Sequence, residues 1–409
     1  MCTGKWEKWL SKMEDEQEWT IAGDPPPITC LAHLEKAAKG AAAKFRHVAQ
    51  TIGKKEKWRP FQTQKYSEPI WFRGDAHWPD NYKLHPTVYR KRSLPPEDRN
   101  AQHPRQGLRT PEKFMLSRFR MEAVSRHADT PGYDEEARWL CLAQHYTLPT
   151  RLLDWSESIL NAAWFGVVDQ KEDEWREYLS QLWEHASGEV GERFCQEQRQ
   201  KFESNLKTMH SNPAIWALSP ALLNYHYVKD GPVFMLEGPH AGVMVSSAFN
   251  GMSIWDTIWA TVPQRLRQRM FEFYRSNSEG DVEDKVLAVK ASQVDARMMQ
   301  QQACFTIHAA RKPEEHDLSR ETPKYYDDED GALNQGAGAT QLPEFLLKFS
   351  VPRDKRSSIR DELQRAGVHN STLFPDLQTL AEETAAEWKA KCATERDRIS
   401  RSLLSQSTD

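Results

Sequence analysis

The stretch that most constrains the fold is Ala143–Ser156, AQHYTLPTRLLDWS, which is followed almost directly by the apolar run Ile159–Val168. The apolar run is typical of a buried helix. Charged groups beside buried structure cost free energy unless they pair with one another or bind a ligand. The sequence therefore predicts a polar site here but does not specify its chemistry. Its candidate side chains are His145, Tyr146, Thr150, Arg151 and Asp154.

The overall composition narrows the class of protein. The 409 residues are 39% hydrophobic, enough for one large domain or two modest ones. The six cysteines are scattered without a CxxC pair, so we expect neither a zinc site nor a disulfide framework. No apolar run reaches the roughly 18 residues of a membrane span, and the first residues lack the apolar core of a signal peptide. We therefore expect a cytoplasmic protein without a membrane partner.

Hydrophobic periodicity and turn signals divide the chain into helices and strands. Strands are expected at 69–74, 214–218, 285–290, 304–308 and 345–351. Helices are expected at 6–13, 31–50, 109–128, 134–144, 159–168, 255–274 and 357–366, the last of them ending at Gly367, a natural C′ residue. This alternation predicts an α+β fold with a small mixed sheet and many surrounding helices.

The same pattern suggests the organisation of domains. Residues 1–60 are interpreted as a helical extension and 61–381 as the main domain. Within it, a charged helical insertion is expected at about 169–212 and an acidic, glycine-rich loop at about 313–340, with a charged helix or tail at 382–409. The insertion and the loop are candidates for regulating access to the site or for binding a partner such as an antitoxin.

A second candidate residue ends the segment PIWFRG, Pro69–Gly74. Arg73 follows three apolar residues at the end of an expected strand. It is either a surface charge with a buried stem or an anion ligand that faces a cleft. The residues alone leave both interpretations open.

Three stretches taken together resemble the FRG domain family, named for its Phe-Arg-Gly motif. They are WFRG around Arg73, the central AQHYTLPTRLLDWS, and Arg297 through Phe305. The resemblance continues to STLFPDLQTLA at 371–381, so that it covers about 68–381. The chain departs from the family pattern at Ala303, where glycine is usual, and at Asp75, where glutamine often follows the motif.

The resemblance implies an origin in bacteria or phages, among defence and toxin-like genes, and a link to the ADP-ribosyltransferase fold. Such an enzyme would use NAD to modify a protein or nucleic acid. Arg73 would hold the pyrophosphate or ribose, and Arg297 would also contact the dinucleotide. His145 and Thr150 would hydrogen-bond ribose hydroxyls, and Tyr146 or Trp155 would stack on the nicotinamide ring. Gln301 would orient the acceptor or the ribose. Arg151 would be a further ligand of the dinucleotide, and Asp154 would be a catalytic residue.

Several of these residues also admit a purely structural interpretation. Asp154 could pair with Arg151 and hold the loop, His145 could be a satisfied core histidine, and Arg297 could form a structural ion pair.

Three functions are therefore weighed. The first is the ADP-ribosyltransferase. The second is a nucleotide- or nucleic-acid-binding module without catalysis, suggested by the absence of a late catalytic glutamate and by arginines near aromatic residues. A metal-dependent hydrolase ranks last, since His145 and Asp154 are too few ligands, and no metal is expected.

Overall fold

The computed structural model describes residues 3–15, 18–56, 69–76, 84–89, 109–126, 130–132, 135–168, 191–200, 212–228, 233–235, 286–291, 296–308, 317–320, 343–386, 388 and 391–392. Within these residues seven strands form one sheet in the order β4-β5-β6-β2-β1-β3-β7. Neighbouring strands are antiparallel except for the parallel pair β4 and β5. The strands are β1 (Trp71–Asp75), β2 (Leu152–Ser156), β3 (Ala214–Leu218), β4 (Phe234–Met235), β5 (Val286–Lys290), β6 (Ala303–His308) and β7 (Leu346–Ser350).

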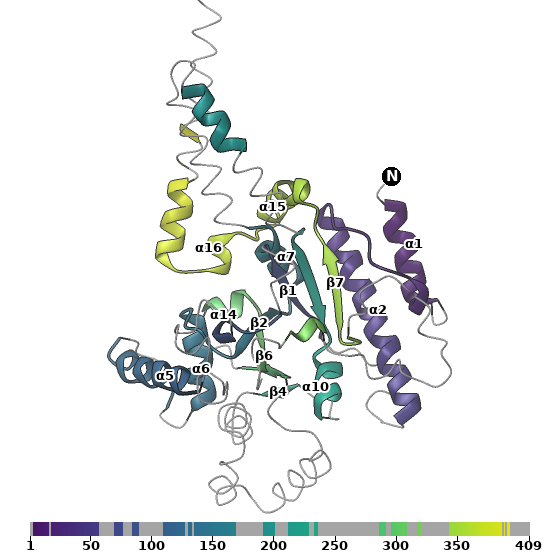
Figure 1. The fold of residues 1–409 in the computed structure, drawn as a ribbon, viewed down its shortest axis with the longest axis horizontal. Helices are drawn as coiled ribbons and strands as arrows, with labels where there is room; N and C mark the ends of the chain where they lie inside the picture. Colours follow the sequence, from purple (N-terminus) through teal and green to yellow (C-terminus); the bar gives the residue numbers. More distant parts are fainter. Residues whose placement is uncertain are drawn as a thin grey trace, which may run out of the picture.

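Helices surround this sheet, as the predicted α+β class requires (Figure 1). The α-helices are α1 (Thr3–Glu14), α2 (Leu31–Glu56), α5 (Arg109–Ala123), α6 (Glu136–His145), α7 (Ile159–Val167), α10 (Pro220–Val228), α14 (Ala296–Gln300), α15 (Arg356–Arg365) and α16 (Asn370–Leu373). Short 3-10 helices are η1 (Trp19–Ile21), η2 (Thr87–Tyr89), η6 (Leu318–Arg320) and η7 (Arg353–Lys355).

The sheet is covered on both faces, which explains why its strands are almost continuously apolar. Alternate residues of β6 point to opposite sides: Cys304 lies in a large core, whereas Phe305 and Ile307 lie in a smaller one. Helices α1, α2, α7, α10 and α15 contribute to the large core, and α6 and α14 to the small one. In Figure 1, α1 and α2 lie beside β7, and α5 and α6 lie at the other end of the molecule.

Helix α7 packs on β1 closely enough for the two backbones to touch. A Cβ atom added to Gly74 would lie 1.8 Å from the Ala162 carbonyl oxygen and 2.3 Å from the Gly166 nitrogen. No side chain fits at that distance, so the glycine of the Phe-Arg-Gly motif is required by packing. Ser158 caps the start of α7 by accepting from the Asn161 backbone, and Arg356 donates to the Val167 carbonyl at its end.

The N-terminal helices join the same large core. Trp6 and Trp9 of α1 are buried, and the Trp9 ring lies over Gly40 of α2, where a Cβ would be 2.2 Å away. The Leu31 backbone N–H at the start of α2 donates to the Glu362 carboxylate of α15 at 2.7 Å. This bond ties the start of α2 to α15, more than 300 residues later in the sequence.

Most predicted elements are confirmed by the structure, with small shifts of their ends. All five predicted strands are present, and Gly367 ends α15 with a φ of +82°. Strand β2 and helices α10 and α14 were not predicted. In the predicted insertion, 191–200 is helical. The rest of 169–211, the helix predicted at 255–274, most of 313–340 and most of 382–409 lie outside the described residues.

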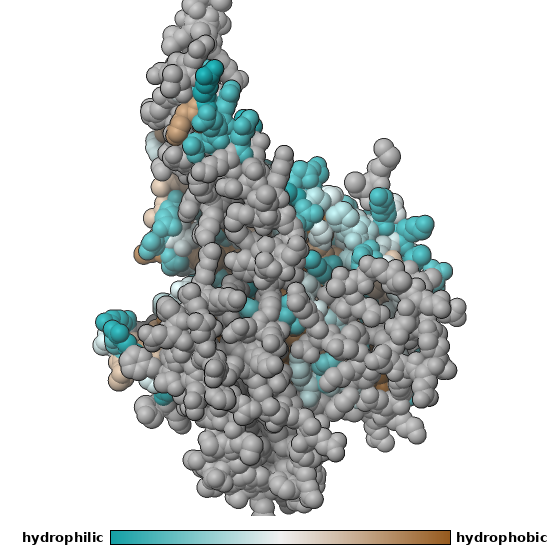
Figure 2. Space-filling view, viewed as in Figure 1, coloured by the Kyte–Doolittle hydropathy of each residue, from teal (hydrophilic) through white to brown (hydrophobic). Residues whose placement is uncertain are grey.

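Figure 2 shows that the described part of one face is mainly hydrophilic, with small hydrophobic areas. Most of the large apolar side chains in the described residues are buried in the two cores. Among the described residues, no helix has the length and apolar character needed to cross a membrane.

Candidate functional site

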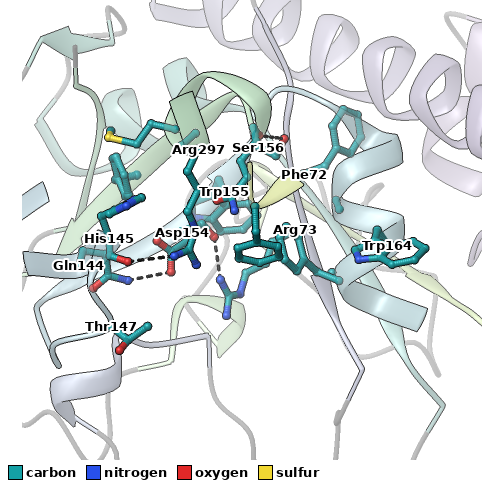
Figure 3. Close-up of a pocket in the computed structure, with 18 of the residues that line it drawn as sticks. Phe72, Arg73, Gln144, His145, Thr147, Asp154, Trp155, Ser156, Trp164 and Arg297 are labelled. Carbon is teal, nitrogen blue, oxygen red and sulfur yellow. Dashed lines mark hydrogen bonds between the residues drawn. The ribbon is translucent and has the colours of Figure 1, made fainter. Parts of the chain in front are cut away.

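A cavity of about 740 Å³ opens where β1 and β2 separate. These strands are paired only at Phe72 and Ser156, whereas β1 and β3 are paired at five successive positions. Beyond the single pair, the Arg73 side chain bridges the gap by donating from Nη1 to the Asp154 carbonyl oxygen at 2.7 Å (Figure 3). A side chain thus replaces part of the missing strand ladder, and the gap beside it is available to a ligand.

Six of the predicted site residues line this cavity, although they come from four separate parts of the chain. They are Arg73, His145, Asp154, Trp155, Arg297 and Gln301. The other three do not line it: Tyr146, Thr150 and Arg151.

Arg73 combines a fixed position with unused hydrogen-bonding capacity. Its Nη1 is held by Asp154, but its Nε is buried and has no hydrogen-bond partner among the described residues. A buried donor left without a partner costs about 1–3 kcal/mol. The guanidinium borders the cavity, where its positive charge can attract an anion.

The Asp154 side chain is exposed in the cavity and is held by Gln144, a residue that was not among the predicted site residues. Gln144 Nε2 donates to Asp154 Oδ2 at 2.7 Å, and its Oε1 accepts from Thr150 Oγ1 at 2.6 Å. The proposed ion pair between Asp154 and Arg151 is not formed. Arg151 is instead buried, and its Nη1 donates to the His308 carbonyl oxygen at 3.4 Å.

Trp155 forms part of the wall with its ring held from behind. Its Nε1 donates to Thr306 Oγ1 at 3.1 Å, and Thr306 Oγ1 in turn lies 2.9 Å from Nε2 of the buried His308. Next to Trp155 in the sheet is Cys304, whose complete burial raises its thiol pKa well above the usual value. This thiol is therefore protonated at neutral pH and is not a candidate nucleophile.

The opposite wall comes from α14 and the segment 370–374, which are far from β1 in the sequence. Arg297 lies over the Phe374 ring, with its Cζ 4.3 Å from the ring centroid, and donates from Nη1 to the His145 carbonyl at 3.3 Å. Gln301 Nε2 donates to the Leu373 carbonyl at 3.1 Å. Arg297 thus fastens this wall to the end of α6, and Gln301 holds the two parts of the wall together.

Two aromatic residues of α7 also contact the wall formed by segment 370–374. Trp164 Nε1 donates to Asn370 Oδ1 at 3.1 Å, and the Phe165 ring meets Phe374 edge-on at 6.1 Å. Trp164, Phe165, Asn370 and Phe374 all line the cavity but were not predicted to do so. The aromatic residues of the apolar run and the resemblance at 371–381 were the available signals for them.

Tyr146 lies outside the cavity wall, which does not support its predicted stacking role. Its ring is exposed and packs edge-on against His145 at 4.9 Å. His145 itself is half-buried, so the interpretation of a core histidine does not describe it fully.

The corner between α6 and β2 carries backbone strain. Thr147 has a φ of +61°, a conformation that a β-branched residue rarely adopts. Its N–H donates to the Gln144 carbonyl, and the Leu148 N–H donates to the Ala143 carbonyl. These two bonds form a Schellman motif, in which glycine normally occupies the position of Thr147. Because Thr147 lines the cavity, the strain lies at the candidate site.

Comparison with known proteins gives one match. The family model of the FRG domain matches residues 68–174. No curated protein and no solved structure matches the chain. The matched segment contains β1, α6, β2 and α7, and with them Arg73, Gln144 and Asp154. The FRG domain model therefore matches the residues that build the first wall of the cavity.

Proposed function

We propose that the cavity binds NAD and that the protein is a cytoplasmic ADP-ribosyltransferase-like effector, of the toxin or phage-defence type, that modifies a protein or nucleic acid. The observation that carries the proposal is the Arg73 guanidinium, which borders the cavity and is held in place by its hydrogen bond to the Asp154 carbonyl oxygen. Arginine binds phosphate through two adjacent N–H groups, which makes the pyrophosphate of NAD a suitable occupant.

The remaining wall fits the other parts of such a ligand. The volume of about 740 Å³ is typical of small-molecule sites. Arg297 supplies a second positive charge, and the aromatic rings offer faces on which a planar base can stack. The Asp154 carboxylate provides a negative charge near the ribose, where positive charge would develop as the glycosidic bond weakens.

In the proposed reaction, the bond between ribose C1 and the nicotinamide nitrogen breaks, and nicotinamide leaves as a neutral molecule with the electron pair. A nucleophilic atom of the acceptor then bonds to C1 and loses its proton to a base or to solvent. Arg73 would bind the ligand, and Asp154 would stabilise the charge at the ribose.

The test is transfer of label from radioactive NAD to macromolecules in a bacterial extract, with wild type and an Arg73→Ala variant. Label that moves only with wild type supports the proposal and begins to identify the acceptor. Free ADP-ribose without labelled macromolecules would indicate a glycohydrolase. Transfer that is equal with both proteins would contradict the role of Arg73.

A binding module without catalysis is the second candidate. It is favoured by the carboxylates that line the cavity in the described residues, since these are Asp75 and Asp154 and include no glutamate. Such a module would bind nucleotide or nucleic acid without consuming NAD. Steep weakening of binding with salt would favour a nucleic-acid ligand, and turnover of NAD would exclude this candidate.

A further inference from the structure

A chain of hydrogen bonds leads from the buried Thr150, through Gln144 in the cavity wall, to the Asp154 carboxylate. The Leu152 backbone N–H donates to Thr150 Oγ1 at 3.1 Å, and Thr150 Oγ1 lies 2.6 Å from Gln144 Oε1. Gln144 Nε2 lies 2.7 Å from Asp154 Oδ2. Figure 3 shows the last of these bonds, with Gln144 pointing from the end of α6 to the strand that carries Asp154.

The direction of the bonds follows from the last member. An ionised carboxylate can only accept, so the amide nitrogen of Gln144 must face Asp154. Gln144 Oε1 is then left to accept the proton of Thr150, whose Oγ1 accepts from the Leu152 N–H. A flipped amide would place two oxygens against each other at Asp154 and would leave the Thr150 proton without its acceptor. The orientation of the Gln144 amide is therefore fixed by the hydrogen-bond donors and acceptors on either side of it.

This chain of hydrogen bonds from Thr150 through Gln144 to Asp154 is called the relay. It holds one oxygen of the Asp154 carboxylate and leaves the other available. Thr150 is only 2% exposed, whereas Asp154 is exposed in the cavity. Gln144 holds Oδ2, and Arg73 holds the backbone carbonyl of the same aspartate. No hydrogen bond within the described part of the chain involves Oδ1. The backbone and side chain of Asp154 are thus fixed from two sides, with one oxygen left to face a ligand.

We infer that Gln144 and Thr150 are positioning residues that aim the Asp154 carboxylate at the reacting ribose. The inference rests on the proposed transferase function. The relay would therefore affect the chemical step of the reaction. A charged group accelerates a reaction when it is already held in position before the reaction begins. Binding of NAD is assigned to Arg73 and the aromatic wall, and neither the Gln144 nor the Thr150 side chain is hydrogen-bonded to them in the described residues.

The test measures kcat and KM for NAD with variants at two points of the relay. Thr150→Val keeps the shape of the side chain and removes the hydroxyl, and Gln144→Leu removes the amide. Each is expected to lower kcat at least 10-fold and to change KM less than threefold. Thr150→Ser restores the hydroxyl and is expected to keep kcat within threefold of wild type. Thr51→Val removes a threonine hydroxyl that bonds only within α2, and serves as the matched control.

Combined variants separate positioning from general damage to the fold. If the three residues act as one unit, Gln144→Leu causes no further loss in kcat once Asp154→Asn is present. Losses that multiply, or a KM that rises while kcat is unchanged, would overturn the relay. All rates are compared well below the melting temperature of each variant, which circular dichroism determines.

The outcomes distinguish the relay from the function on which it rests. Wild type that neither binds nor consumes NAD overturns both. Wild type that consumes NAD, together with relay variants equal to wild type, overturns the relay and leaves the transferase proposal in place.

Discussion

The two edges of β1 are built in different ways. Along one edge, five residues of β1 pair with β3, which continues into β7. Along the other edge, a single residue pairs with β2, and the Arg73 side chain reaches across the gap. The neighbouring residues Arg73 and Gly74 both border the cavity, and Gly74 also touches the backbone of α7. In this sheet the loss of strand pairing beside the cavity is thus accompanied by a full ladder on the other edge of β1 and by close packing on α7.

The largest effect is expected on the packed side of the strand. Gly74→Ala would force a Cβ into the Ala162 carbonyl and should lower the free energy of unfolding by roughly 3 kcal/mol or more. Gly4→Ala is the matched control, because a Cβ there meets nothing within 4 Å and α1 gains helix propensity. Urea unfolding of both variants is the measurement. Equal stability of the two would show that β1 and α7 are not in backbone contact.

On the open edge of β1, a substitution should change the affinity for the ligand and leave the free energy of unfolding almost unchanged. Arg73→Met keeps the stem of the side chain and removes two charge-assisted hydrogen bonds to an anion, so affinity for NAD should fall roughly 100-fold. The free energy of unfolding should change by less than about 1 kcal/mol. Titration calorimetry and denaturation test both parts, with the exposed Arg118→Met as control. A large loss of stability with unchanged affinity would make Arg73 a structural residue.

A half-buried cation bonds to a strand carbonyl in each half of the sheet, and of the two only the lysine loses its proton at accessible pH. Lys44 donates to the Leu346 carbonyl of β7 at 2.7 Å, much as Arg73 donates to Asp154. Burial lowers the Lys44 pKa to about 8, although Glu344 opposes the shift. Between pH 8 and 10.5 the unfolded chain keeps a proton that the folded protein has lost, so this residue's contribution to stability rises with pH.

The Lys44 effect is measured as the difference in unfolding free energy between wild type and Lys44→Met. That difference should shift in favour of wild type by about 2–3 kcal/mol from pH 7 to pH 10. Other alkaline titrations affect both proteins equally and cancel. A difference that does not vary with pH would mean that Lys44 keeps its charge in the folded state.

The smallest effect concerns two helix ends with the same hydrogen bonds. The C′ residue just beyond α15 is Gly367, and the C′ residue just beyond α6 is Thr147, which lies beside the cavity. Both have a positive φ. Thr147→Gly should raise the free energy of unfolding by about 0.5–1 kcal/mol, and Gly367→Thr should lower it by about 1 kcal/mol. Thermal unfolding of the pair tests this. A destabilised Thr147→Gly variant would show that the threonine side chain contributes more than its strain costs.

Local patterns in the sequence were enough to predict most of the elements. Five strands and the long helices have clear periodicity, and Gly367 marked the end of α15. Strand β2 was missed because Asp154 interrupts its apolar residues, and because its main partner, β6, lies about 150 residues away. Helix α14 has only five residues, too few for a helical period to be visible.

The site was predictable in part. Arg73 and Asp154 were selected from motifs, and the structure places them in contact. Gln144 was missed, since a glutamine near the end of a helix gives no signal until the fold brings it to Asp154. Tyr146 was selected by its type, but its direction depends on the strained corner at Thr147, which periodicity does not predict.

The distance along the chain between the two walls of the cavity has a consequence during protein synthesis. Trp155 is in the first wall and Phe374 in the last, about 220 residues later. At the usual 5–20 residues per second, a ribosome needs roughly 10–40 seconds to add them. During that interval the nascent chain carries Arg73 and Asp154 without the wall that faces them. A chain that emerges in this order cannot complete its cavity until synthesis has passed Phe374.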